Sequence, residues 1–464
     1  MLGFVQNWFA PRANPIGVDF GSDCLRLAQV QFVGSGTIGE HKLFAAASAD
    51  VPQHIRQNAA ARIQFFIETT RELLAQGNFR GREAILALPA ASMFIQHLRM
   101  SKMSEEETKK ALPWEARGKL PIDPSQALMR HLIAGEVYQD QEQKNEVIVM
   151  AAAREFIDGL LAAAAKAKLD VIGMNVEPKA LVDCFTHVYR RKSDADVTSC
   201  YVDIGCVATR VIIARGQQIF FARTIPVGGD HFSRAVAHEK RMSFEEAKLL
   251  RIRLCAATPA LDDSRQKQLI CEESSNGATA SEPAVADSSF ALLEAGLRAS
   301  AHGEPTSVGV SSGTGRKSQG ENATVAAATS PSLKAPVAGS TEIDQSRLVE
   351  HACREPLTKL VEELDLCRRY YEATFPSKPV DRLIFVGGEA RQRSLCQHVA
   401  RELGIAAQLG DPLARMGRIS DIGIETGIDR RLPQPSWAVA LGLSLGPAVP
   451  SAGEVNATRT EVRA

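Results

Sequence analysis

One pattern of apolar and polar positions occurs twice in this chain. Residues 17–30 read as an apolar strand, an Asp-x-Gly turn at 19–21 and a second apolar strand, and residues 201–213 repeat this order around a turn at 203–205. Each copy predicts two strands joined by a short turn. Glycine in such a turn lets the backbone approach a ligand and present N–H groups to phosphate oxygens. Two facing copies predict a nucleotide-binding cleft between two related halves.

Strand-like and helix-like segments alternate along most of the sequence. The predicted strands after the first copy are 84–88, 146–151, 171–176, 199–204, 209–215, 218–224 and 383–386. Apolar positions at helical spacing predict a helix around Ile63 to Leu74 and others at 105–119, 154–168, 179–189, 229–239, 244–256, 346–373, 391–403 and 438–445. Such alternation is typical of an α/β architecture.

Two segments have a different composition. Residues 262–342 are rich in Ser, Ala, Gly, Thr and Glu, with almost no aromatic residues, and the tail 447–464 is similar. Segments of this kind cannot bury enough apolar surface to offset the entropy lost on ordering. We therefore predict a disordered insertion and a disordered tail.

Length, charge and cysteine content exclude several classes of protein. A chain of 464 residues holds about two to four domains. Its 54 basic and 54 acidic residues create no overall field for nucleic acid, and no apolar run approaches the roughly 20 residues that span a bilayer. The N-terminus lacks a basic leader, and nine cysteines without a CxxC pair suit reduced thiols. These features predict a cytoplasmic protein.

Further glycine pairs strengthen the prediction of a nucleotide cleft. Gly387-Gly388 lies between an apolar strand and a helix, which is where an α/β sheet can admit a nucleotide, and Gly228-Gly229 leads into another helix. Asp19 and Asp203 could hold a hydrated Mg²⁺. Taken singly, each motif is more often an ordinary turn or helix cap, so the prediction depends on their joint occurrence.

In their order, these motifs resemble the actin-like ATPase superfamily. The match is to the PilM family of type IV pilus assembly proteins, which is related to the FtsA family of cell-division proteins. It is carried by IGVDFGSDCLRLAQV, LPWEARGKLPIDPSQAL, YVDIGCVATRVIIARGQQIFFARTIPVGGDHFSRAVA, LIFVGGEARQRSLCQHVARELGIAAQLGDPLARM and PSWAVALGLSL, and covers about 14–256 and 346–446. The resemblance implies two lobes around a nucleotide cleft. The expected lobes are 14–198, with an extra subdomain at about 90–172, and 199–446, interrupted at 262–342.

The resemblance also implies ATP and Mg²⁺ as cofactors and assigns residues to them. The phosphates would lie between Asp19, Gly21 and Ser22 on one side and Asp203, Gly205 and Thr209 on the other. Gly228 and Gly229 would approach the ribose and phosphates, Gly387 and Gly388 the adenosine, and Asp19 and Asp203 the metal. The catalytic candidates are Asp203 and Glu177, the latter to orient water. Where the family usually carries Glu-x-x-Lys near the adenine, this chain has Lys248 and Arg251.

The function implied is that of an ATP-binding scaffold, with weak or no ATPase activity, at the inner face of the inner membrane. Its partner would be the short cytoplasmic tail of a PilN-like membrane protein, with pilus motor ATPases and self-association as further options. Membrane association would be peripheral, through partners, and nucleic acid is not expected. Three alternatives remain open: an FtsA-like division protein, a polymerising ATPase and a pseudo-ATPase interaction module.

Overall fold

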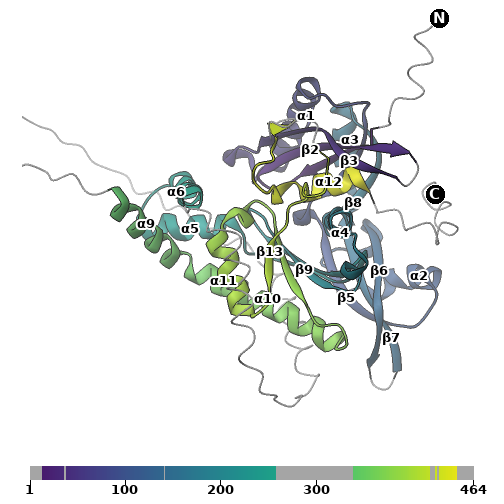
Figure 1. Ribbon diagram of the computed structural model, residues 1–464. Coiled ribbons are helices and arrows are strands. Elements are labelled where there is room, and N and C mark those ends of the chain that lie inside the picture. The colour runs from purple at the N-terminus through teal and green to yellow at the C-terminus, as the bar shows by residue number, and fades with distance from the viewer. Residues whose placement is uncertain are drawn as a thin grey trace, which may run out of the picture.

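The computed structural model of the chain describes residues 13–35, 38–139, 142–257, 338–417, 424–425 and 428–446 (Figure 1). The predicted tail 447–464 lies outside these residues, as does the predicted insertion up to residue 337. Positions 338–342 of the insertion belong to a helix. No helix among the described residues is both long enough and apolar enough to cross a membrane.

The first sheet has five strands in the order β3-β2-β1-β4-β8. They are β1 Ile16–Phe20, β2 Cys24–Ser35, β3 Ile38–Asp50, β4 Glu83–Leu88 and β8 Asp170–Val176. The pairs β1–β2 and β2–β3 are antiparallel, whereas β4 and β8 join in parallel. Side chains alternate along β1, so Ile16 and Val18 pack in the core shared with helices α1 Ala59–Gln76 and α3 Arg154–Lys166. Gly17 faces the opposite side, where a Cβ would lie 2.0 Å from the carbonyl oxygen of Ala440.

The second sheet repeats the first. Its order is β11-β10-β9-β12-β13, built from β9 Thr198–Ile204, β10 Thr209–Arg215, β11 Gln218–Ile225, β12 Arg382–Val386 and β13 Ala407–Leu409. Again a three-stranded antiparallel meander is extended by two parallel strands. The repeated sequence pattern thus corresponds to a repeated topology. We propose the two sheets as the centres of two lobes that divide near residues 198 and 199.

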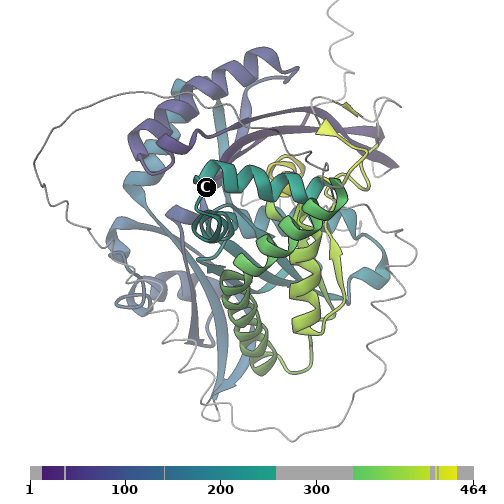
Figure 2. The same cartoon turned by 90° about the vertical axis from the view of Figure 1, so that its left-hand side faces the viewer.

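Helices from the second half pack beside the second sheet. They are α5 Gly229–Lys240, α6 Phe244–Ala257, α9 Ala338–Ala352, α10 Arg354–Thr374 and α11 Arg393–Leu403. In Figure 2 the teal and green helices of residues 229–257 and 338–374 gather on the side that faces the viewer. The helix predicted at 346–373 is two helices, because the helical run is interrupted at Cys353.

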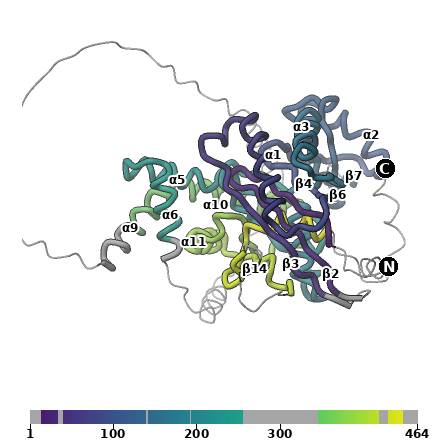
Figure 3. Tube along the Cα trace, turned by 90° about the horizontal axis from the view of Figure 1, so that it is seen from above, coloured from purple at the N-terminus to yellow at the C-terminus, as the bar shows by residue number. Residues whose placement is uncertain are grey.

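A third sheet lies within the range predicted for the extra subdomain. Its order is β5-β7-β6, from β5 Phe94–Ser101, β6 Ala127–Gln139 and β7 Glu142–Ala153, and helix α2 Glu105–Glu115 packs on it. Helix α3 also falls within 90–172, and β8 begins there, but α3 packs on the first sheet and β8 belongs to it. Figures 1 and 3 place α2 and α9 at opposite ends of the molecule.

Two crossing helices connect the parts. Helix α4 Glu177–Val188 follows β8, and the last helix, α12 Ala438–Leu445, returns to pack on the first sheet. At their crossing, a Cβ on Gly442 would lie 1.8 Å from the carbonyl oxygen of Ala180, so only glycine permits this approach. Because α4 begins at the carboxyl end of β8, its first residue, Glu177, lies near the two Asp-x-Gly turns.

Candidate functional site

The first Asp-x-Gly turn joins β1 to β2 and is held by a guanidinium group. The Gly21 amide donates to the carbonyl oxygen of Cys24 at 3.0 Å. Arg62 of α1 donates to the carbonyl oxygens of Ser22 (2.9 Å) and Gly21 (3.0 Å), and its guanidinium lies over the Phe20 ring. The carbonyl groups of this turn therefore point at α1.

The second turn, between β9 and β10, is held by the start of α5. The amides of Gly229 and Asp230 donate to the carbonyl oxygens of Gly205 (3.0 Å) and Cys206 (2.7 Å). A Cβ on Gly228 would lie 2.6 Å from the Gly205 carbonyl oxygen, so this glycine is required by close backbone packing. The buried hydroxyl of Thr209 donates to the Val227 carbonyl oxygen at 2.7 Å, which ties β10 to the same loop.

Three carboxylates and two guanidinium groups gather beside these turns. Arg210 Nε donates to Asp203 Oδ2 at 2.8 Å, and Arg210 Nη1 lies 2.8 Å from Glu177 Oε2. Asp19 is 3.8 Å from Arg26, which stands opposite it in the β1–β2 register. The side chains of all three acids are 8% exposed or less. The structure thus brings together the three predicted acidic residues.

Burial dominates the protonation behaviour of Asp19 and Glu177 in this cluster. It raises the pKa of Asp19 to about 6, although Arg26 and Arg210 act in the opposite direction. It also raises the pKa of Glu177 to about 7 against the effect of Arg210, and the charges of Asp19 and Asp203 add to this rise. The pKa of Arg210 is raised: burial alone would lower it, but the charges of Asp203 and Glu177 outweigh that effect.

A buried ion pair occupies the side predicted for the adenosine. Arg251 of α6 donates to Glu389 Oε2 at 2.6 Å, and also to the Gly229 carbonyl oxygen (2.8 Å) and Ser233 Oγ (2.7 Å). Glu389 covers Gly229, where a Cβ would lie 2.1 Å from its Oε1. The side chain of the half-buried Lys248 makes no hydrogen bond or ion pair with other described residues.

Replacing Arg251 by methionine is expected to lower the free energy of unfolding by about 2–3 kcal/mol. The side chain is 2% exposed, so its removal leaves the Glu389 carboxylate without its cationic partner and withdraws one donor each from the Gly229 carbonyl oxygen and Ser233 Oγ. Urea denaturation followed by circular dichroism measures the change. Arg253→Met on the exposed side of the same helix is the control. Equal stability of the two variants would contradict the importance of the ion pair.

The two predicted adenosine glycines differ. Gly387 has a φ of +90°, and a Cβ there would lie 2.4 Å from Asp203 Oδ1. Gly388 has an ordinary helical conformation with open space around its Cα. Packing therefore explains the first glycine without a ligand, but it does not explain the second.

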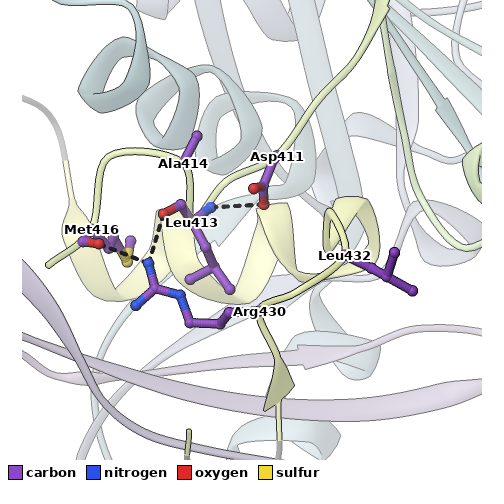
Figure 4. Close-up of a pocket in the computed structure, with 6 residues that line it drawn as sticks. All are labelled: Asp411, Leu413, Ala414, Met416, Arg430 and Leu432. Atoms are coloured by element: carbon purple, nitrogen blue, oxygen red, sulfur yellow. Dashed lines mark hydrogen bonds between the residues drawn. The ribbon is translucent and has the colours of Figure 1, made fainter. Parts of the chain in front are cut away.

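A cavity of about 250 Å³ lies elsewhere (Figure 4). Arg430 crosses it and donates to the carbonyl oxygens of Leu413 (3.0 Å) and Met416 (2.7 Å). The other lining residues are Asp411, Ala414 and Leu432. None of the predicted site residues lines this cavity.

Comparison with known families decides the classification. Residues 17–254 match the family described as type IV pilus assembly protein PilM. The chain belongs to this PilM family. A second match, to cell division protein FtsA, covers residues 200–442. The PilM match includes the first sheet and the third sheet, whereas the FtsA match begins only at the second sheet.

One solved structure agrees with the fold expected of the PilM family, and two others are more distant. A PilM-PilN type IV pilus biogenesis complex is 18% identical, with a TM-score of 0.61, and the match covers 94% of this chain and 98% of that chain. The ethanolamine utilization protein EutJ of Carboxydothermus hydrogenoformans is 14% identical (TM-score 0.42, 94% and 90% covered). An activator of 2-hydroxyisocaproyl-CoA dehydratase from Clostridium difficile, solved with bound ADPNP, is 10% identical (TM-score 0.35, 93% of each chain covered). Comparison with curated proteins gives no match. The predicted actin-like ATPase fold is confirmed.

Sequence analysis missed the basic residues that bind the predicted acids. Arg210 follows Thr209 directly, and its place opposite Asp203 in a two-stranded hairpin was the available signal. Arg56, after β3, also crosses to the second turn, 3.6 Å from Cys206 Sγ and 3.9 Å from Asp230 Oδ1. Nothing in the local sequence indicates that contact.

The acids have the chemistry that Mg²⁺ prefers, but their arrangement does not fit the ion. One guanidinium already pairs with both Asp203 and Glu177. Among the residues that the structure describes, no cluster of at least three His, Cys, Asp or Glu side chains is arranged to hold a metal. A Mg²⁺ ion and Arg210 would therefore compete for the same oxygen atoms.

Proposed function

We propose that this PilM-family chain is a cytoplasmic scaffold of a type IV pilus or related secretion machine. It would lie at the inner face of the inner membrane and bind the short cytoplasmic tail of a PilN-like protein. Two findings support the proposal: the PilM family match over residues 17–254, and the structural match of 94% of the chain to a PilM-PilN complex. The third sheet, which the PilM match includes, supports the pilus alternative over an FtsA-like division role.

Contacts among the predicted nucleotide-binding residues favour a scaffold over an ATPase. A hydrolytic site needs an acid that is free to orient water. Here Glu177 and Asp203 are both engaged by Arg210, and Arg251 with Glu389 fills the predicted adenosine side. ATP remains the ligand proposed for the cleft, bound between the two turns with weak or no turnover. Pilus motor ATPases and self-association remain further proposals.

The extra subdomain offers a surface for a peptide. Trp114 at the end of α2 is 71% exposed, and the guanidinium of Arg117 lies 5.0 Å from the centre of its ring. Exposed tryptophans are frequent anchors of protein interfaces because they bury a large apolar area on binding. We propose that the partner tail contacts Trp114.

Binding of the tail tests the scaffold role directly. A fluorescein-labelled synthetic peptide of the cytoplasmic tail of the PilN-like protein from the same organism is titrated with the full chain, and its anisotropy is recorded with and without ATP. We expect saturable binding that Trp114→Ala weakens about tenfold, or about 1.4 kcal/mol.

The matched control is Leu249→Ala on α6, a side chain that is 65% exposed at the other end of the molecule. It should bind the peptide as tightly as the wild type. No binding by the wild type would contradict the scaffold proposal, and equal weakening by both substitutions would contradict the assigned surface. Recovery of only division proteins in a parallel pull-down would favour the FtsA-like alternative.

A further inference from the structure

Arg210 joins two acidic residues from different parts of the fold. It stands on β10 of the second sheet, Asp203 on neighbouring β9, and Glu177 at the start of α4, directly after the first sheet. Its Nε and Nη1 are each 2.8 Å from one carboxylate oxygen. A planar guanidinium can pair with two carboxylates at once in this way, which a lysine cannot match.

The hairpin fixes the position of this guanidinium. Arg210 is the direct cross-strand neighbour of Asp203, so their side chains lie on one face of the sheet. A Cβ on Gly205 would lie 3.4 Å from Arg210 Nη2 and 3.0 Å from the Ala208 carbonyl oxygen. The glycine of the second Asp-x-Gly turn therefore avoids a tight contact with the backbone of its own turn, and a side chain there would just touch the guanidinium.

The charges of the cluster nearly balance without a metal. Asp19, Asp203 and Glu177 supply three negative charges when ionised, and Arg210 and Arg26 supply two positive charges, which leaves a net charge of minus one. The side chains of Asp203 and Glu177 are 5% and 3% exposed, so water cannot replace Arg210 as their partner. A divalent cation at these oxygens would lie beside a guanidinium of the same sign.

We infer that Arg210 is a built-in counter-cation, which takes the charge-balancing place of a divalent metal between Asp203 and Glu177 and connects the two halves of the fold in metal-free protein. The two carboxylates are then neutralised by a side chain of the protein itself. Divalent cations have little to add to its stability, and they gain access to the two carboxylates only when the guanidinium is removed.

The test measures stability and metal binding in the full chain without nucleotide. The melting temperature of wild type, Arg210→Met and Arg210→Lys is followed while MgCl2 or MnCl2 is raised to millimolar levels against NaCl of equal ionic strength. We expect no metal-dependent rise for wild type, and a lower melting temperature for Arg210→Met that the divalent cation raises again. The melting temperature of Arg210→Lys should lie between those of wild type and Arg210→Met. An ammonium group keeps the positive charge, but it cannot place two N–H groups toward the two carboxylates as a guanidinium does.

Arg215→Met is the matched control on the same strand, since Arg215 pairs with the 85% exposed Asp196. It should behave as wild type. A metal-dependent rise in wild type as large as in Arg210→Met, or no response in a folded Arg210→Met, would overturn the inference. If Arg210→Met does not fold, wild type and Asp203→Asn are titrated with MgCl2 in a calorimeter. Micromolar binding of Mg²⁺ by wild type that is lost in Asp203→Asn overturns the inference. No binding of Mg²⁺ by wild type supports it. Neither outcome depends on the peptide test of the scaffold role.

Discussion

Replacing Gly387 by alanine is expected to lower the free energy of unfolding by about 3–5 kcal/mol. The residue adopts a φ of +90°, which disfavours any side chain, and the added Cβ would lie 2.5 Å from the Ile204 carbonyl oxygen and 2.4 Å from Asp203 Oδ1. Backbone atoms of β9 cannot move aside without breaking the pairing of β9 with β12. Urea denaturation in nucleotide-free buffer measures the loss.

Gly388→Ala is the matched control, one residue further along. Its φ of −65° suits alanine, and a Cβ there meets no atom within 4 Å. We expect a change within about 0.5 kcal/mol. Similar stability of the two variants would show that Gly387 is kept for a ligand instead of for packing. A Gly388→Ala protein of normal stability that loses ATP binding would support the proposed adenosine role of Gly388.

Replacing Glu146 by glutamine is expected to cost about 3–5 kcal/mol. The side chain is fully buried in β7 of the third sheet, and it contacts His97 Nδ1 (3.0 Å), Arg99 Nε (3.3 Å) and the Tyr370 hydroxyl (2.7 Å). Tyr370 belongs to α10, so this carboxylate ties the third sheet to the second half of the fold. A glutamine side chain has nearly the same volume, but it lacks the negative charge that attracts these three donors. Urea denaturation at neutral pH measures the effect.

Two further measurements separate the effect of the Glu146 charge from that of its packing: the stability in acid, and the stability of a variant at an exposed glutamate. Burial would raise the pKa of Glu146, but the hydrogen bond and charge of His97, with Tyr370 and Arg99, lower it below its ordinary value of 4.5. The ionised group therefore stabilises the native state above about pH 4.5, and this contribution is lost as the pH falls through the native pKa. The wild type should lose stability in acid more steeply than Glu146→Gln. Glu136→Gln, from a half-exposed pair with Lys102, should change the free energy by less than about 1 kcal/mol.

Local patterns predicted many of the elements, because strand and helix periodicities involve neighbouring residues, but they gave no bounds for strands β3, β5 and β6. The strand at 84–88, the hairpin strands at 209–215 and 218–224 and the last helix at 438–445 are found within one residue of their predicted bounds. The helix at 346–373 was predicted as one piece, although it is interrupted at Cys353, since periodicity does not register a single non-helical residue. The domain limits stay predictions.

The sequence by itself determined the repeated strand–turn–strand frame, and through it the fold and the place where Asp19, Asp203 and Glu177 meet. Only the tertiary structure decided what balances their charge. Arg210 reaches Glu177 because the start of β10 lies beside the start of α4, an earlier part of the chain, and Arg251 of α6 reaches Glu389 across a longer separation in sequence. A long-range ion pair produces no periodic pattern in the sequence. The packing of the elements determines which residues meet, and their spacing along the chain does not.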